Sequence, residues 1–158
     1  MPTFRSERRV RHTAADMFDL VADCESYPQF VPLCTGMRVW ARKPAGEGVE
    51  TAMAEMSVGY KAIRETFTTR ATFDRPRMKI LVEYVDGPFS RLENRWTFRD
   101  LPSPDGRPQS LVEFYIAYEF RSRMLALVMG SMFDAAFRKF AAAFEKRADE
   151  IYGKRAGA

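Results

Sequence analysis

SLVEFYIAYEF at residues 110–120, followed by RSRMLALVMGSMFDAAFRKFAAAFEKRADEIY at residues 121–152, decides the fold of this chain. The first segment alternates apolar and polar residues, and a period of two predicts a β-strand with one buried and one solvated side. The buried side of this strand carries Val112, Phe114, Ile116, Tyr118 and Phe120. The second segment changes to helical spacing, so the chain ends with a strand that leads into a long helix.

The predicted C-terminal helix runs from about Ser122 to Tyr152. Its apolar residues recur at steps of three or four: Met129, Phe133, Phe137 (or Ala136), Phe140, Phe144, Ala148 and Ile151. Such a helix is amphipathic and on the order of 45 Å long, enough to lie across a whole sheet. Gly130 interrupts it at a cost of about 1 kcal/mol relative to alanine. This glycine either permits close backbone packing or marks a kink near a pocket mouth.

The same period of two extends upstream, from Leu33 to Phe120. Turn-forming residues divide this region into six strands, with breaks at Pro44–Gly48, Gly59, Asp74–Pro76, Asp86–Pro88 and Leu101–Pro108. The strand before the last turn is also cleanly patterned, with Leu92, Asn94, Trp96 and Phe98 facing inward. Such alternation in neighbouring strands predicts an antiparallel sheet with one wet face.

The first third of the chain adds a strand and two helical segments. Thr3 to Val10 reads as a strand, and Thr13 as the N-cap of a helix that ends near Asp23. The prolines between Tyr27 and Pro32 force a compact turn or a short second helix. The order predicts one α+β domain over residues 1–158, in which a curved antiparallel sheet of about seven strands wraps around the long helix. Because a twisted sheet curls, one helix cannot fill its concave side, and the remaining space suits an apolar ligand.

Composition narrows the partners and the compartment. A net charge of +4, from 25 Lys and Arg against 21 Asp and Glu, is too small to indicate a DNA-binding protein, although it favours loose contact with an anionic membrane or RNA. Cys24 and Cys34 cannot form a disulfide framework, which fits a reducing compartment. We find no secretory signal, and the longest apolar run, Met124 to Phe133, is too short to span a bilayer. We therefore expect a cytoplasmic protein.

Residues for catalysis or metal binding are scarce. His12 is the sole histidine, and no phosphate loop, nucleophile elbow or metalloprotease motif occurs, so we expect neither an enzyme nor a metal site. Two polar residues are predicted to face inward, Glu65 on the face of Phe67 and Asn94 beside Trp96. Such groups either bond within the protein or meet a polar ligand head group. A cyclase-type enzyme, the weakest alternative, has only these two to use.

Two motifs add a resemblance that covers residues 5–152. YPQFVPLC at residues 27–34 is similar to the YPxFxPxC signature of the coenzyme Q-binding START-like family, within the polyketide cyclase/START helix-grip superfamily. DGPF at residues 86–89, followed by Leu92, Trp96 and Phe98, resembles the second signature of that family, DGPFxxLxxxWxF. The resemblance implies a helix-grip fold that binds ubiquinone or its polyprenyl tail without catalysis or a separate cofactor, and so supports respiratory electron transport. The chain starts almost directly on its first strand, which favours a bacterial protein over a mitochondrial precursor.

The resemblance also implies positions for the site. Tyr27, Phe30 and Cys34 would shape one end of the cavity, and Leu92, Trp96, Phe114 and Tyr118 would line its concave wall. The apolar pattern adds Met56, Phe67, Ile116, Met129 and Phe133. The pattern does not separate pocket residues from core residues.

A second function remains open. The bacterial branch of the family includes ribosome-association toxins that inhibit subunit joining, and the outward arginines Arg91, Arg95 and Arg99 would serve such binding. The segment from Met124 to Phe133 is the candidate for peripheral contact with the cytoplasmic membrane.

Overall fold

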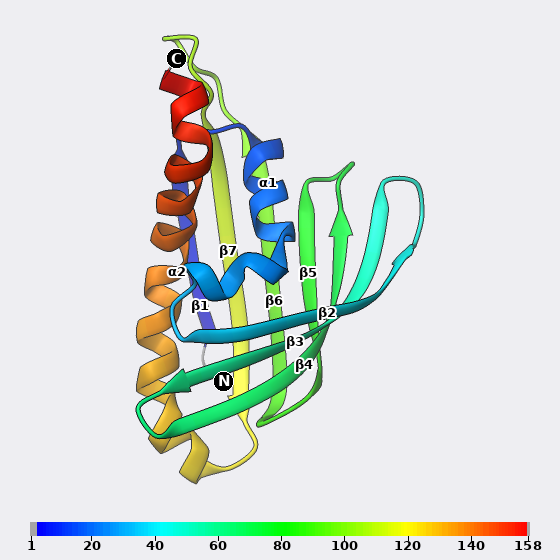
Figure 1. Ribbon diagram of the computed structural model, residues 1–158, viewed down its shortest axis with the longest axis vertical. Helices are drawn as coiled ribbons and strands as arrows, with labels where there is room; N and C mark the ends of the chain where they lie inside the picture. Colours follow the sequence, from blue (N-terminus) through cyan, green and yellow to red (C-terminus); the bar gives the residue numbers. More distant parts are fainter. Residues whose placement is uncertain (1–2, 158) are drawn as a thin grey trace.

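The computed structural model describes the backbone of residues 3–157 and the side chains of residues 3–153. Its elements follow the predicted order of one strand, two helical segments, six strands and a long helix (Figure 1). They are β1 (Thr3–Val10), α1 (Ala14–Ala22), the 3-10 helix η1 (Cys24–Gln29), β2 (Cys34–Pro44), β3 (Val49–Tyr60), β4 (Ile63–Asp74), β5 (Lys79–Asp86), β6 (Phe89–Asp100), β7 (Ser110–Phe120) and α2 (Arg123–Gly157). The predicted break at Gly59 lies slightly later, since β3 continues to Tyr60.

All seven strands form one antiparallel sheet in the order β1-β7-β6-β5-β4-β3-β2. From β2 to β7 each strand pairs with the next one in the sequence. The exception is β1, which pairs with β7 over its whole length, from Thr3 opposite Ala117 to Val10 opposite Ser110. The sheet therefore has β1 at one edge and β2 at the other.

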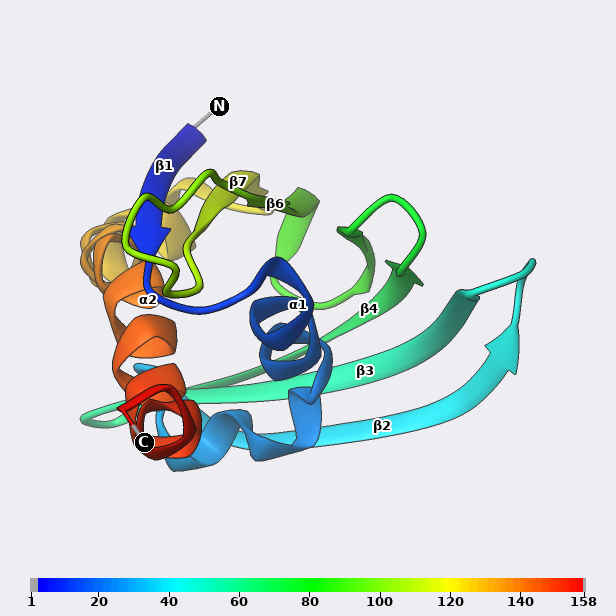
Figure 2. The same ribbon diagram turned by 90° about the horizontal axis from the view of Figure 1, so that it is seen from above.

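The sheet curves around the helices, as the view from above shows (Figure 2). Register shifts accompany this curvature in β2, between Cys34 and Gly36 and between Trp40 and Lys43. Others lie between Thr68 and Thr69 and near Ser90. Each such bulge bends its strand and increases the local twist. The result is a concave face with α1 inside the curve and α2 along its open side.

The two N-terminal helical segments, α1 and η1, follow local signals in the sequence, namely a capping threonine and a proline. The Thr13 hydroxyl accepts a hydrogen bond from the Asp16 amide at 3.0 Å, which confirms the predicted N-cap of α1. Helix α1 buries Met17, Phe18 and Val21 against the sheet. The proline-containing segment forms a short 3-10 helix with Pro28 inside it, one of the two predicted possibilities.

Helix α2 is about 50 Å long at 1.5 Å per residue. The Ser122 hydroxyl caps it by accepting a hydrogen bond from the Leu125 amide at 3.1 Å. Its buried face follows the predicted stripe through Met129, Phe133, Phe137, Phe144 and Ala148. At the end of this stripe the prediction is wrong, because Ile151 is 44% exposed and the neighbouring Tyr152 packs on the core instead.

Gly130 has open space beside it. A β-carbon built at this position meets nothing within 4 Å, leaving out the backbone of its own helix turn. The interpretation that Gly130 permits close backbone packing is therefore wrong.

None of the helices among residues 3–157 has the length and apolar character that crossing a membrane requires.

Candidate ligand-binding site

An apolar cavity lies between the concave face of the sheet and α2. Strands β3 to β7 supply most of its wall, and α2 closes it with side chains that include Phe133, Phe137, Phe140 and Phe144. The alternation of each strand turns every second residue toward this space. The cavity thus occupies the place that the sequence predicts, between a curved sheet and the long helix.

Eight of the predicted site residues line this cavity: Tyr27, Met56, Phe67, Leu92, Trp96, Phe114, Ile116 and Phe133. They come from six strands and helices that are far apart in the sequence. Trp96 lies at the centre of this group, with its ring 4.8 Å from that of Phe114 and 5.0 Å from that of Phe144. Their role in ligand binding stays a prediction, while their position around one cavity is observed.

Two predicted aromatic residues lie elsewhere. Phe30 packs on the far side of the wall, against the rings of Tyr27 and Phe144 at 6.1 and 5.0 Å. Tyr118 belongs to an aromatic cluster beyond the end of the cavity, where its ring lies 5.3 Å from Phe137 and 6.1 Å from Phe89. Both side chains support the wall without lining it.

Cys34 and Met129 are also core residues and not cavity residues. The Cys34 thiol donates a weak hydrogen bond to the Gly36 carbonyl at 3.5 Å, within its own strand. Met129 is only 1% exposed, so it fills the core beneath the first turns of α2. The apolar pattern of the sequence could not separate them from lining residues, because core and cavity share one face.

Other lining residues were not among the predicted set. Phe140 and Phe144 lie on the predicted apolar stripe of α2, so the helical periodicity of the sequence could have identified them as lining residues. Cys24 lines the cavity where Cys34 was expected, because η1 turns Cys24 inward next to Tyr27. The inward face of β4 also contributes Thr69 and Phe73.

The polar groups of the wall are mostly engaged within the protein. The Trp96 indole Nε1 donates to the Asn94 amide oxygen at 3.0 Å, and Asn94 Nδ2 donates to the Tyr115 carbonyl at 2.8 Å. The Tyr27 hydroxyl donates to the Val21 carbonyl. Thr69 also lines the cavity and is 6% exposed. Glu65 shares the face of Phe67, as predicted, but it is half-buried near the strand end and does not line the cavity.

Burial raises the pKa of three groups at the η1 end of the cavity. The pKa of the Cys24 thiol and that of the Cys34 thiol rise from 9.0 to about 11, and the pKa of the Tyr27 phenol rises well above 10. In each case removal from water disfavours the charged form. Both thiols are therefore protonated at neutral pH, which makes them poor nucleophiles and poor metal ligands.

The single histidine holds two parts of the fold together. His12 is 3% exposed, and its Nε2 lies 2.7 Å from Asp149 Oδ1 on α2. This contact joins the loop after β1 to the C-terminal part of the helix. Within the described part of the chain, no group of three His, Cys, Asp or Glu residues is arranged to hold a metal ion.

The cavity is small for a ligand site. Its volume is about 90 Å³, whereas pockets for drug-sized ligands hold roughly 300–1,000 Å³. The phenylalanines of α2 fill the rest of the concave side. A long apolar ligand can enter only if these rings rotate or if the N-terminal half of α2 moves outward.

Comparisons with known proteins agree with this architecture. The family model for polyketide cyclase/dehydrase and lipid transport proteins matches residues 10–145. The ribosome association toxin RatA of Escherichia coli is 36% identical over 155 residues, which cover 98% of this chain and 92% of that protein. The mitochondrial coenzyme Q-binding protein COQ10 homolog B of Xenopus laevis is 32% identical over 140 residues, covering 87% of this chain and 54% of that protein.

A solved START superfamily protein from Mycobacterium smegmatis has the same fold, with a TM-score of 0.75 over 94% of this chain and 98% of that one, at 20% identity. The curved antiparallel sheet and the long C-terminal helix of this chain match a START-like helix-grip fold. The chain has a START-like fold, is related to the RatA and COQ10 proteins, and belongs to the polyketide cyclase/dehydrase and lipid transport family.

Proposed function

We propose that this protein binds a hydrophobic ligand in the cavity without catalysing a reaction, and that the ligand is ubiquinone or another molecule with a polyprenyl tail. The observation that carries this proposal is the apolar wall around Trp96, which is enclosed by α2 and has few free polar groups. The similarity to a coenzyme Q-binding protein supports the choice of ligand. Such a carrier would support respiratory electron transport from the cytoplasm, in peripheral contact with the membrane.

Energetics favours an apolar ligand over a charged one. Burying a polyprenyl tail contributes about 25 cal/mol for each Å² of apolar surface removed from water. A charged ligand would find no buried counter-charge in this wall, since its members are apolar apart from Cys24, Tyr27, Thr69, Asn94 and the Trp96 indole. Most of the affinity for ubiquinone would therefore come from its polyprenyl tail, and its quinone ring would add specificity.

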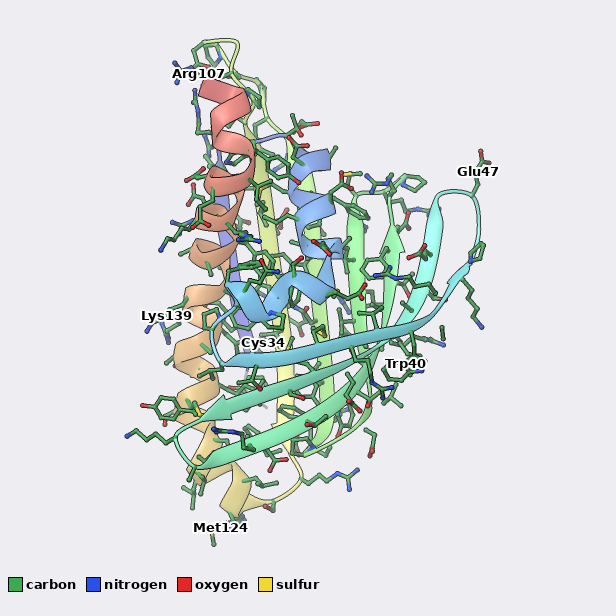
Figure 3. The ribbon with its side chains drawn as sticks, viewed as in Figure 1. Cys34, Trp40, Glu47, Arg107, Met124 and Lys139 are labelled. Atoms are coloured by element: carbon green, nitrogen blue, oxygen red, sulfur yellow. The ribbon has the colours of Figure 1, made fainter. Side chains whose placement is uncertain are left out.

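The fluorescence of Trp96 offers a direct test. The chain has two tryptophans, and Trp40 lies on the edge strand β2, away from the cavity (Figure 3). In a Trp40→Phe variant, ubiquinone should quench the remaining emission with saturable binding. Organic extraction of the purified protein, followed by mass spectrometry, should also recover a quinone or a polyprenyl lipid. An empty extract together with no quenching by added ubiquinone would reject the proposal.

A second function, binding to a ribosomal subunit with inhibition of translation, is supported by the similarity to RatA over almost the whole chain. The outward face of β6 presents the exposed arginines Arg91, Arg95 and Arg99. Arg95 pairs with Glu93 and lies over the Tyr115 ring at 5.4 Å. The protein should then co-sediment with ribosomal subunits less strongly as salt rises, because phosphate contacts release counterions. Absence of co-sedimentation at low salt would reject this function.

A further inference from the structure

Large apolar side chains gather on the surface at one end of α2. Met124 is 69% exposed, Leu127 81% and Val128 49%. Their spacing of three and four residues places them on one face of the helix. Tyr60, at the end of β3, is a further exposed apolar residue, at 45%. We call these four residues the α2 patch. A concentration of exposed apolar surface of this kind marks an interaction site.

The patch continues into a groove between α2 and the turn that joins β3 to β4. This groove holds about 410 Å³ and is lined by both Tyr60 and Val128. Ile63 and Met132 extend its apolar lining. Its size falls in the range of roughly 300–1,000 Å³ that ligand sites occupy.

The groove and the inner cavity share part of their walls. Pro32, Leu33 and Ala136 line both of them. Only these side chains therefore separate the outer groove from the apolar interior at this place. Leu33 is held in the left-handed region with a φ of 68°, and its carbonyl accepts a hydrogen bond from the Gly59 amide at 3.0 Å. The groove and the cavity thus adjoin at these three residues.

Cations surround the patch. Lys61 and Arg64 are exposed in and after the β3–β4 turn, and Lys139 lines the groove. Arg123 is exposed in the first turn of α2, which contains no acidic residue. A cation at this end is unfavourable for the helix itself, because the helix N-terminus already carries a partial positive charge. Asp86 also lies at this end, 3.7 Å from Arg121.

From this arrangement we infer that the α2 patch docks on a bilayer with anionic headgroups, and that the ligand enters the cavity through the adjoining groove. The apolar residues insert among the lipid chains while Lys61, Arg64 and Arg123 meet the headgroups. Apolar area and cations together are what holds a protein at an anionic interface. The docking surface rests on the proposed function, since it explains how a membrane-dissolved ligand reaches the interior.

Flotation with lipid vesicles tests the docking. The protein should bind vesicles that contain phosphatidylglycerol more tightly than vesicles of phosphatidylcholine alone, and the difference should shrink with salt. Leu127→Glu should abolish binding. Lys61→Gln combined with Arg123→Gln should weaken it about tenfold or more, at about 1 kcal/mol for each cation near the surface.

Matched control variants lie at the other end of the molecule. Ile151 is an exposed apolar residue of the same helix, so Ile151→Glu should leave vesicle binding unchanged. Arg107 projects from the end opposite Met124 (Figure 3), so Arg107→Gln should also have no effect. The docking surface would be overturned if Leu127→Glu still bound vesicles as the wild type does. It would also be overturned if Ile151→Glu reduced vesicle binding as much as Leu127→Glu.

Ubiquinone binding in detergent separates this inference from the proposed function. Leu127→Glu should bind ubiquinone in detergent as the wild type does, but should load from vesicles at least about tenfold more slowly. If the wild-type protein bound ubiquinone in detergent but did not bind vesicles, the docking surface would be overturned and the proposed carrier function would stand. One that binds no ubiquinone under either condition would reject the carrier function. If Leu127→Glu abolished dimer formation or ribosomal co-sedimentation while vesicle binding persisted, the patch would belong to that partner and not to a bilayer.

Discussion

Trp96 and Asn94 lie two residues apart on β6, face the same cavity, and are joined by a 3.0 Å hydrogen bond from the indole Nε1 to the amide oxygen. Asn94 in turn donates a hydrogen bond from its Nδ2 to the Tyr115 carbonyl on β7. This pair places two polar groups in an apolar wall without leaving either unpaired. It also fixes the orientation of the largest ring that the ligand would contact.

Replacement of Asn94 by leucine should therefore destabilise the protein. The substitution leaves the Trp96 N–H and the Tyr115 carbonyl without this partner, at about 1–3 kcal/mol for each unsatisfied buried group. Urea unfolding should show a total loss of about 2–6 kcal/mol. In the background of Trp96→Phe, which has no N–H, the same substitution should cost less. Equal costs in both backgrounds would show that the hydrogen bond does not stabilise the fold.

Thr69 should contribute to binding the quinone ring of a ligand and not to binding its polyprenyl tail. Its side chain is a polar group of the cavity wall and is 6% exposed. Thr69→Val keeps the shape and removes one hydrogen bond to a quinone oxygen, worth about 0.5–1.5 kcal/mol or roughly a two- to twelvefold loss of affinity. Titration with ubiquinone should show this loss, whereas binding of a polyprenyl hydrocarbon should be unchanged. A parallel loss for both ligands would assign Thr69 a packing role only.

Phe140 should limit how much ligand the cavity accepts. This half-buried side chain of α2 lines a cavity of about 90 Å³. Phe140→Ala should enlarge the cavity, increase the rate and extent of ubiquinone loading, and lower the free energy of unfolding by up to about 3–5 kcal/mol. Phe30→Ala is the matched control, because Phe30 is also half-buried but packs outside the cavity. Similar loading of both variants would contradict the restriction by Phe140.

Cys24 should make stability depend on alkaline pH. Its pKa is about 11 in the folded protein against 9.0 for an unperturbed thiol, so the folded state retains the proton more tightly. The resulting stabilisation is fully present below pH 9 and is lost as pH rises from 9 to 11. At about 1.4 kcal/mol for each pH unit, the loss is about 2–3 kcal/mol.

The measurement compares the wild type with Cys24→Ala across this pH range. The stability advantage of the wild type should shrink between pH 9 and pH 11. An advantage that stays constant over the range would show that the thiol titrates as it does in the unfolded chain.

The arrangement of elements could be predicted because it depends on periodicity and turn residues. The alternation in residues 110–120 and the stripe of α2 are local patterns, and Thr13 is a local capping signal. The site could be predicted only in part. Cys24 and Cys34 are equally apolar in the sequence, and the geometry of η1 decides which of them reaches the cavity.

The same limit explains the misplaced aromatic residues. Tyr118 shares the inward face of β7 with Phe114 and Ile116, so its pattern is that of a cavity residue. Its position along the strand places it among Phe89, Phe120 and Phe133, which fill that end of the concave side. Whether an inward residue meets space or another ring depends here on packing across β6, β7 and α2, which no local sequence pattern records.

The pairing of β1 with β7 has a consequence for the order in which the chain assembles. In β2 to β7 each strand pairs with the next one in the sequence. Thr3 on β1, in contrast, can pair only after Ala117 on β7 has been synthesised. Contacts over such a separation slow folding, because a long loop has to close first. A nascent chain that stops before Ser110 would expose β6 as an open edge and leave β1 unpaired, a state prone to association with other strands. Strand β1 is synthesised before the other strands of this sheet and is thus among the last to be incorporated into it.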